Sequence, residues 1–152
     1  MNNPKSDCIA NYNPMKKRLN CILLIDDDSS DNFIHKMIIK NMDIADHIDV
    51  ALNGEEGLKY LLRDNTPVPE IIFLDINMPK MNGWEFMEEY KKLDESRRSK
   101  IVIGMLTTSF NPDDKSKSKF TTDIESFNNK PLTEEMLSQI IDKHFPYLKE
   151  KV

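Results

Sequence analysis

The stretch Ile22-Leu23-Leu24-Ile25-Asp26-Asp27-Asp28 joins an apolar run to three consecutive aspartates. A second apolar run, residues 71–74, stops at Asp75, and a third, residues 101–106, stops at Thr107. Lys130 follows a fourth and shorter run. Continuous apolar runs are typical of strands that are buried on both faces of a parallel sheet. The polar residues therefore stand at the carboxyl ends of expected parallel strands, where open α/β sheets bind their ligands.

Strands and helices are expected to alternate from residue 20 onward. The apolar runs predict strands at residues 21–25, 47–51, 70–74, 101–106 and 124–128. Apolar residues recur at helical spacing between these runs. Ser29 or Ser30 is expected to cap the first helix, and Thr133 the last. The alternation predicts a flavodoxin-like α/β fold: a five-stranded parallel sheet in the order 2-1-3-4-5, with five helices on both faces.

One of these helices is expected to differ from the others. Pro112 and the two aspartates after it suit the start of a helix within residues 111–122. Residues 115–119, however, contain no apolar side chain. The fourth helix is therefore predicted to be short and weakly anchored.

The predicted strand order brings several carboxylates together. Strands one and three are neighbours at the switch point of the sheet, so Asp26, Asp27 and Asp75 are expected to share one pocket. Crowded carboxylates repel one another unless a cation lies among them, and oxygen ligands of this kind suit Mg²⁺. A lysine beside them indicates an anion, such as a phosphoryl group, next to the metal.

Length and composition indicate one domain. The 152 residues suit a single core at residues 19–152, preceded by a flexible leader at residues 1–18 that is rich in Asn and Pro. The cysteines, Cys8 and Cys21, suggest neither a disulfide framework nor a zinc site. The histidines, His35, His47 and His144, follow no ligand spacing, and we expect them at the surface or at sheet edges.

Charge and hydropathy exclude other classes of partner. The formal net charge of -5 argues against nucleic acid, which usually binds a basic patch. No apolar run approaches the roughly 20 residues that span a bilayer. The amino terminus carries no basic-then-apolar signal pattern, so a cytoplasmic protein is expected.

In the order of its motifs, the chain from about Leu19 to Phe145 resembles the receiver domain of bacterial two-component response regulators. The resemblance is carried by the acidic pair after strand one, by Asp75 within Leu-Asp-Ile-Asn-Met-Pro, by Gly83, by Thr107 and by the Lys130-Pro131 pair. It implies a stand-alone signalling domain, similar to chemotaxis regulators, rather than an enzyme. Its partners would be a histidine kinase or phosphotransfer protein and a downstream protein target, and the chain would be a monomer or a weak homodimer.

The resemblance also implies residue roles. Asp75 would accept the phosphoryl group, assisted by Thr107 and Lys130, and the bond between Lys130 and Pro131 would be cis. The ligands of Mg²⁺ would be the residues Asp26, Asp27, Asp75 and, through its backbone carbonyl, Asn77. Asp28 is expected to cap a helix rather than to bind the metal. Thr107 and Phe127 would form a switch that passes phosphorylation to the surface.

Two alternatives stay open at this stage. Asp26-x-Asp28 after an apolar strand also resembles the nucleophile motif of haloacid-dehalogenase-type phosphatases, although Thr107-Thr108 stands where those enzymes carry a later acidic pair. A receiver-like binding module that no longer accepts phosphate is the other alternative. The residue after Thr107 is small in many receivers and is Thr108 here. Many receivers also carry a Gly-Ala pair before strand five, where this chain has residues 121–126, so the chain departs from the family at its usual output surface.

Overall fold

The computed structural model describes residues 18–64, 67–98, 101–108 and 123–149. Its strands form one parallel sheet in the order β2-β1-β3-β4-β5, as predicted. Their bounds are β1 Leu19–Ile25, β2 Ala45–Ala51, β3 Ile71–Asp75, β4 Val102–Thr107 and β5 Ile124–Asn129. The helix expected within residues 111–122 lies outside the described residues. So do residues 1–17, and the leader therefore stays a prediction.

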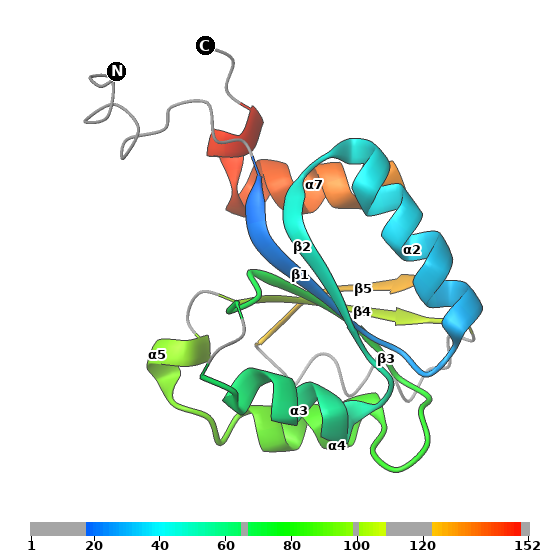
Figure 1. The fold of residues 1–152 in the computed structure, drawn as a ribbon, viewed down its shortest axis with the longest axis vertical. Helices are drawn as coiled ribbons and strands as arrows, with labels where there is room; N and C mark the ends of the chain where they lie inside the picture. Colours follow the sequence, from blue (N-terminus) through cyan, green and yellow to red (C-terminus); the bar gives the residue numbers. More distant parts are fainter. Residues whose placement is uncertain (1–17, 65–66, 99–100, 109–122, 150–152) are drawn as a thin grey trace, which may run out of the picture.

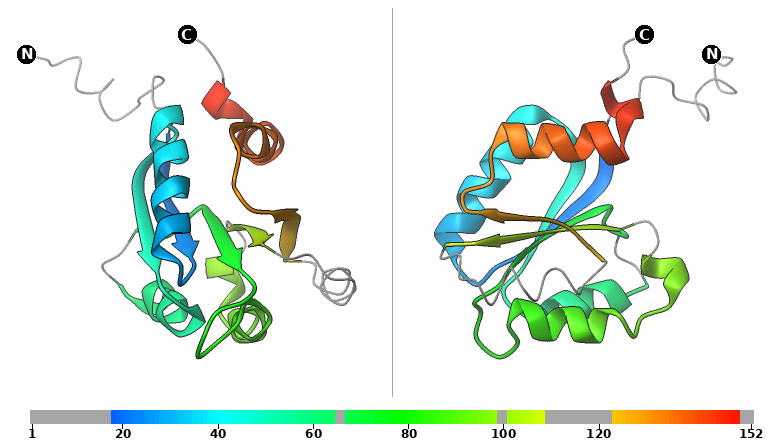
Figure 2. Two further views of the ribbon diagram at one scale, coloured as in Figure 1. Left: turned by 90° about the vertical axis from the view of Figure 1, so that its right-hand side faces the viewer. Right: turned by 180° about the vertical axis from the view of Figure 1, so that it is seen from behind.

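Helices cover both faces of the sheet. Figure 1 shows α2 (Ser29–Met42) and α7 (Glu134–His144) on one side, and α3 (Gly54–Leu62) and α4 (Gly83–Tyr90) on the other. The same layers are visible from the side and from behind in Figure 2. A single-turn helix α5 (Glu95–Arg98), which the periodicity did not predict, and a 3-10 turn η1 (Pro146–Lys149) complete the described elements. No helix in the described part of the chain is long and apolar enough to cross a membrane.

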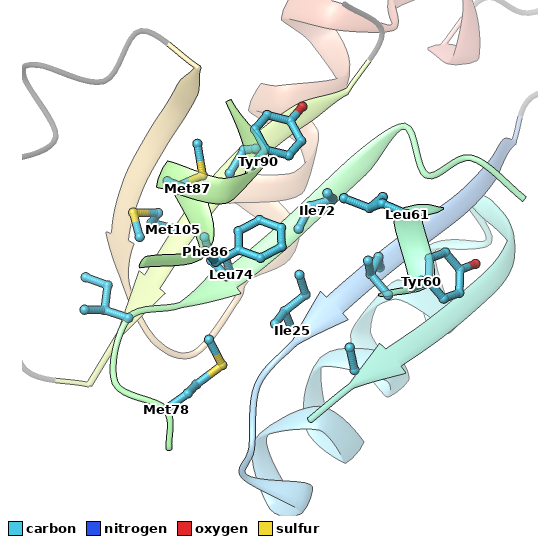
Figure 3. Packing of buried hydrophobic residues seen from close by; sticks show 14 of the residues in the cluster. Ile25, Tyr60, Leu61, Ile72, Leu74, Met78, Phe86, Met87, Tyr90 and Met105 are labelled. Carbon is cyan, nitrogen blue, oxygen red and sulfur yellow. The ribbon is translucent and has the colours of Figure 1, made fainter. Parts of the chain in front are cut away.

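Successive residues of β1 point into two separate cores, as strand geometry requires. Leu23 and Ile25 pack into the core beneath α3 and α4, where Phe86 and Tyr90 are also buried (Figure 3). Ile22 and Leu24 pack into the core beneath α2 and α7. Both faces of β1 and β3 are covered, which explains the continuous apolar runs in the sequence.

Caps fix where the helices begin. The side chain of Asp28 accepts hydrogen bonds from the backbone N–H groups of Ser30 and Asp31 at the start of α2. The prediction that Asp28 caps a helix is therefore confirmed. The prediction that Ser29 or Ser30 caps this helix is wrong. The predicted cap Thr133 is confirmed at the start of α7.

The first half of α2 buries polar residues and exposes apolar ones. Phe33, Ile34 and Met37 have the helical spacing of a core face, yet they are 65%, 44% and 47% exposed. The buried residues of this helix are Asn32, His35 and Ile39. The expectation that His35 lies at the surface or at a sheet edge is therefore wrong, since it lies on α2 and only 2% of it is exposed.

Candidate functional site

Asp26 is fixed at the end of β1 by its own backbone and by its neighbours. Its amide N–H donates to the carbonyl of Ala51 on the adjacent strand, over 2.9 Å. Its carbonyl accepts a 2.9 Å hydrogen bond from the side-chain amide of Asn32. Its Oδ1 atom accepts a 3.0 Å bond from the N–H of Asp28. The other carboxylate oxygen, Oδ2, faces the site, where it accepts a 2.6 Å hydrogen bond from the ammonium of Lys130.

Three carboxylates meet at this edge of the sheet. Oxygen atoms of Asp26, Asp27 and Asp75 all lie within 4.8 Å of one another. Asp26 and Asp75 are buried, whereas Asp27 is exposed. Ligand oxygens around Mg²⁺, at about 2.1 Å from the ion, lie about 3 to 4 Å apart, so modest side-chain rotation would suffice to close the set. The donors present, all of them carboxylate oxygens, therefore fit Mg²⁺.

Lys130 brings the positive charge of the site from the loop after β5. Its backbone N–H donates to the carbonyl of Thr107, over 2.8 Å, and its peptide bond to Pro131 is cis, as the resemblance implied. Its Nζ lies 2.6 Å from Asp26, 2.8 Å from Asp31 and 3.4 Å from Asp75. Only 7% of the side chain is exposed. The buried ammonium of Lys130 thus forms ion pairs with three carboxylates.

Burial and like charge act together on Asp75. Its burial, and next the negative charge of Asp26, raise the pKa of Asp75 to about 6, against the lowering effect of Lys130. The neighbouring carboxylates disfavour the charged form of Asp75 but favour the charged form of Lys130. Burial disfavours its charge, but hydrogen bonds from Lys130 to Asp26 and Asp31 raise the pKa of its ammonium above the ordinary value. Lys130 therefore stays charged, while the carboxyl of Asp75 is easier to protonate than an ordinary aspartate.

The sequence profile described as "Response regulator receiver domain" matches residues 22–142. The chain belongs to this family. It is therefore a receiver domain of two-component signalling, and no observation favours the haloacid-dehalogenase alternative.

Known proteins place this receiver domain among other response regulators. It is 32% identical to the response regulator Rcp1 of Synechocystis over 61% of its own length and 65% of that protein. It is 30% identical to the two-component response regulator ARR22 of Arabidopsis thaliana over 86% of this chain and 87% of that one. The chain spans only 10% of the sensor histidine kinase CheAY of Helicobacter pylori, with 35% identity over 53% of its own residues.

Solved structures confirm the fold. A two-component response regulator from Cytophaga hutchinsonii superimposes with a TM-score of 0.77 and 30% identity, covering 88% of this chain and 99% of that one. The Mn²⁺-bound form of Rcp1 superimposes with a TM-score of 0.66 and 26% identity, covering 88% of this chain and 97% of that one.

The remaining predicted site residues lie on β4, on β5 and in the loop after β3. Thr107 ends β4 and is fully buried. Asn77 is an exposed residue in the loop after β3. Phe127 lies half-buried on β5, and its ring stacks on that of Trp84 with centroids 6.3 Å apart. The structure thus places Thr107 and Asn77 at the ends of strands that carry the site, while Phe127 lies farther along β5.

Gly83 allows the loop after Asp75 to pack closely. Its N–H donates to the carbonyl of Ile76 over 2.8 Å. A Cβ atom at this position would lie 2.6 Å from the carbonyl oxygen of Asp75 and 2.9 Å from the Cα of Ile76. Backbone atoms cannot move aside as a side chain can, so only glycine fits here without rearrangement.

The sequence analysis did not predict two residues that contact Lys130 or the segment directly after it. Asp31 binds Lys130 from the first turn of α2. His35, one turn further along, accepts a 3.2 Å hydrogen bond at Nε2 from the N–H of Leu132, just after the Lys130-Pro131 pair. Burial lowers the pKa of His35, which keeps the imidazole neutral and able to accept this bond. The available signal was the helical spacing of polar residues on a helix that starts at the site.

Proposed function

We propose that this receiver domain accepts a phosphoryl group on Asp75 from a phosphohistidine of a histidine kinase or phosphotransfer protein. The observation that supports it best is the convergence of Asp75 with two further carboxylates and the ammonium of Lys130. A carboxylate oxygen of Asp75 attacks phosphorus, the P–N bond breaks, and its electrons leave with the imidazole of the donor. The chain then signals through contact with a downstream protein.

The metal in this proposal is Mg²⁺, held by the residues Asp26, Asp27, Asp75 and the backbone carbonyl of Asn77. When bound, it would offset the repulsion between these carboxylates and the phosphoryl oxygens. A related structure, that of Rcp1, is of a Mn²⁺-bound form, and Mn²⁺ also prefers oxygen ligands. Lys130 would contact a phosphoryl oxygen on Asp75, since its Nζ already lies 3.4 Å from that side chain.

Treatment with acetyl phosphate and Mg²⁺, followed by mass spectrometry of the phosphorylated peptide, tests the proposal. We expect an aspartyl phosphate on Asp75 and none in the Asp75→Asn variant or in the presence of EDTA. Phosphate on Asp26 would instead favour phosphatase-type chemistry. No modification at all would favour a binding module that no longer accepts phosphate.

A pair of neighbouring aspartates offers a matched control for the metal. Asp27→Asn removes a proposed ligand and is expected to abolish phosphorylation. Asp28→Asn removes the same charge one residue later, but Asn caps helices as well as Asp does. The second variant should therefore keep its fold and its phosphorylation. Equal rates for the two variants would contradict the metal assignment.

The exposed apolar side chains of α2 support a docking surface for the phosphoryl donor. Phe33, Ile34 and Met37 lie on the helix that begins beside the carboxylates, and clustered exposed apolar groups are typical of interaction sites. A donor that reaches Asp75 would cover this helix. Met37→Ser should slow transfer from the cognate kinase and leave phosphorylation by acetyl phosphate unchanged. Slowing of both reactions would point to damage to the site itself.

A further inference from the structure

Lys130 is held on the α2 side of the site rather than on the side of the phosphoacceptor. Its two short contacts are with Asp26, at 2.6 Å, and with Asp31, at 2.8 Å. The contact with Asp75 is 3.4 Å, beyond the usual hydrogen-bond distance. To bind a phosphoryl oxygen on Asp75, the ammonium must therefore weaken at least one of its shorter contacts.

Asp31 stands apart from the proposed metal ligands. The carboxylates that come within 4.8 Å of one another are those of Asp26, Asp27 and Asp75, and Asp31 is not among them. Mg²⁺ held by that set would offset the charges of Asp26 and Asp75 but not the charge of Asp31. Among the carboxylates that contact Lys130, Asp31 would then be the one without a competing cation.

Asp31 is also well placed to persist as a partner. It lies in the first turn of α2, and its N–H donates to the capping side chain of Asp28 over 3.1 Å. A carboxylate at this end of a helix is favoured by the helix dipole. Its side chain is 27% exposed, compared with 7% for that of Lys130, so the pair is only partly shielded from water.

On the basis of the proposed function, we propose that Asp31 is a positioning residue that competes with the phosphoryl group on Asp75 for the ammonium of Lys130. Before phosphorylation, Asp31 keeps the charged side chain of Lys130 inside the site through their ion pair. After phosphorylation, the same ion pair weakens the interaction between Lys130 and the phosphoryl group. Loss of the Asp31 charge frees the lysine to move toward Asp75.

Beryllofluoride, a mimic of the phosphoryl group, measures this competition directly. Calorimetric titration in saturating Mg²⁺ is expected to show Asp31→Asn binding beryllofluoride about fivefold more tightly than the unaltered chain, from the partial loss of one charge-assisted bond. Asp31→Glu keeps a carboxylate and is expected to restore most of the original affinity. Two outcomes would contradict the proposed competition. One is that Asp31→Glu binds beryllofluoride as tightly as Asp31→Asn does, and the other is that Asp31→Asn binds it more weakly than the unaltered chain.

A double-mutant cycle separates an effect through Lys130 from a general change of charge. In a Lys130→Met background, Asp31→Asn should change the beryllofluoride affinity by less than about twofold, because the residue that transmits the effect is gone. The same fivefold gain in both backgrounds would show that Asp31 acts by long-range charge alone, and the inference would fail.

Glu55→Gln provides a matched control. Glu55 is an exposed carboxylate in the first turn of α3, at the same edge of the sheet, and the described ion pairs of Lys130 do not include it. Its small effect should be equal in both backgrounds. Failure of the unaltered chain to bind beryllofluoride would overturn the proposed function together with this inference. Binding without coupling between Asp31 and Lys130 would overturn this inference alone.

Discussion

The strands that carry the carboxylates and the strand that leads to the lysine differ in how tightly they are packed. All five residues of β3 are buried, whereas none of the six residues of β5 is fully buried. Asp75 ends the first of these strands, and Lys130 directly follows the second. The difference suggests that the carboxylates sit on a rigid base while the lysine and Phe127 belong to the part that can shift.

The largest expected effect tests this difference in packing with one side-chain type. Ile72 on β3 is fully buried, and Ile124 on β5 packs against the same core while half-buried. Ile72→Ala should lower the free energy of unfolding by about 4 kcal/mol, and Ile124→Ala by about 1 to 2 kcal/mol, since less apolar surface leaves water at the second position. Urea denaturation of both variants measures the values. Equal losses would remove the distinction between a rigid and a loose strand.

Two glycines test packing through an added Cβ atom: Gly83 at the start of α4, against the backbone after β3, and Gly104 on β4, beside Ser126 of β5. Gly83→Ala drives a Cβ atom against the backbone of Asp75 and Ile76, so we expect a loss of about 2 to 3 kcal/mol. At Gly104 the added atom would meet the Ser126 hydroxyl at 3.0 Å and the Phe73 ring at 3.1 Å. The serine can rotate, and alanine reduces the entropy of the unfolded chain, so Gly104→Ala should stay within about 1 kcal/mol of the unaltered protein. Denaturation midpoints that reverse this order would contradict a rigid backbone around Asp75.

These differences also explain what the sequence could predict. The runs at residues 22–25 and 71–74 identified the central strands, because burial on both faces leaves no polar position in them. The carboxylates at their ends followed from the predicted strand order alone. The expectation of Asp26, Asp27 and Asp75 in one place thus needed no knowledge of side-chain geometry.

Helix α2 shows where the same reasoning stops. Periodicity assigns burial by polarity, yet this helix buries Asn32 and His35 and exposes Phe33 and Met37. The imidazole of His35 has a hydrogen-bond partner that is distant in sequence, the N–H of Leu132. Such a partner is known only once β5 and α7 have been placed beside α2. The role of Asp31 was missed for the same reason, since Lys130 lies far along the chain.

The pH dependence of stability compares one carboxylate from each region, Asp75 at the end of β3 and Glu125 on β5. The pKa of Asp75 is raised to about 6 in the fold, whereas an unfolded aspartate has a pKa of about 3.9. The folded protein binds more protons between these values, so stability falls as the pH rises from about 4 to about 6 and stays lower above. In EDTA, Asp75→Asn should therefore gain up to about 3 kcal/mol at pH 8 and little at pH 4. Guanidinium denaturation across this range measures the gain.

Glu125 on β5 should show the opposite sign. Its hydrogen bond with Lys143 lowers the pKa of Glu125. A lowered pKa stabilises the fold above the unfolded value of about 4.3, and this stabilisation is lost as the pH falls below it. Glu125→Gln should therefore cost stability at pH 8 and little below pH 4. A shared sign for the two variants would mean that the carboxylates of β3 and β5 do not differ in their surroundings.

The smallest expected effect is spectroscopic and tests whether β5 responds when Asp75 is occupied. Trp84 is the single tryptophan of the chain, so its emission reports one place. It follows Gly83, which packs on the backbone of Asp75, and its ring stacks on Phe127 of β5 at an interplanar angle of 19°. Beryllofluoride with Mg²⁺ is expected to change this emission, because a shift of Phe127 alters the stack.

Two variants decide whether the signal travels through that stack. Phe127→Leu should reduce the emission change by more than half relative to its own baseline, with the beryllofluoride affinity measured separately by calorimetry. Tyr147→Leu removes an exposed aromatic ring that packs on Phe145, away from Trp84, and should leave the emission change intact.

Amide exchange at residues 123–129 should also change when beryllofluoride binds, while β3 stays protected, because few fully buried side chains hold β5 in place. An emission change that survives Phe127→Leu would mean that Trp84 senses the loop after Asp75 directly. The loosely packed strand would then have no part in passing the signal on.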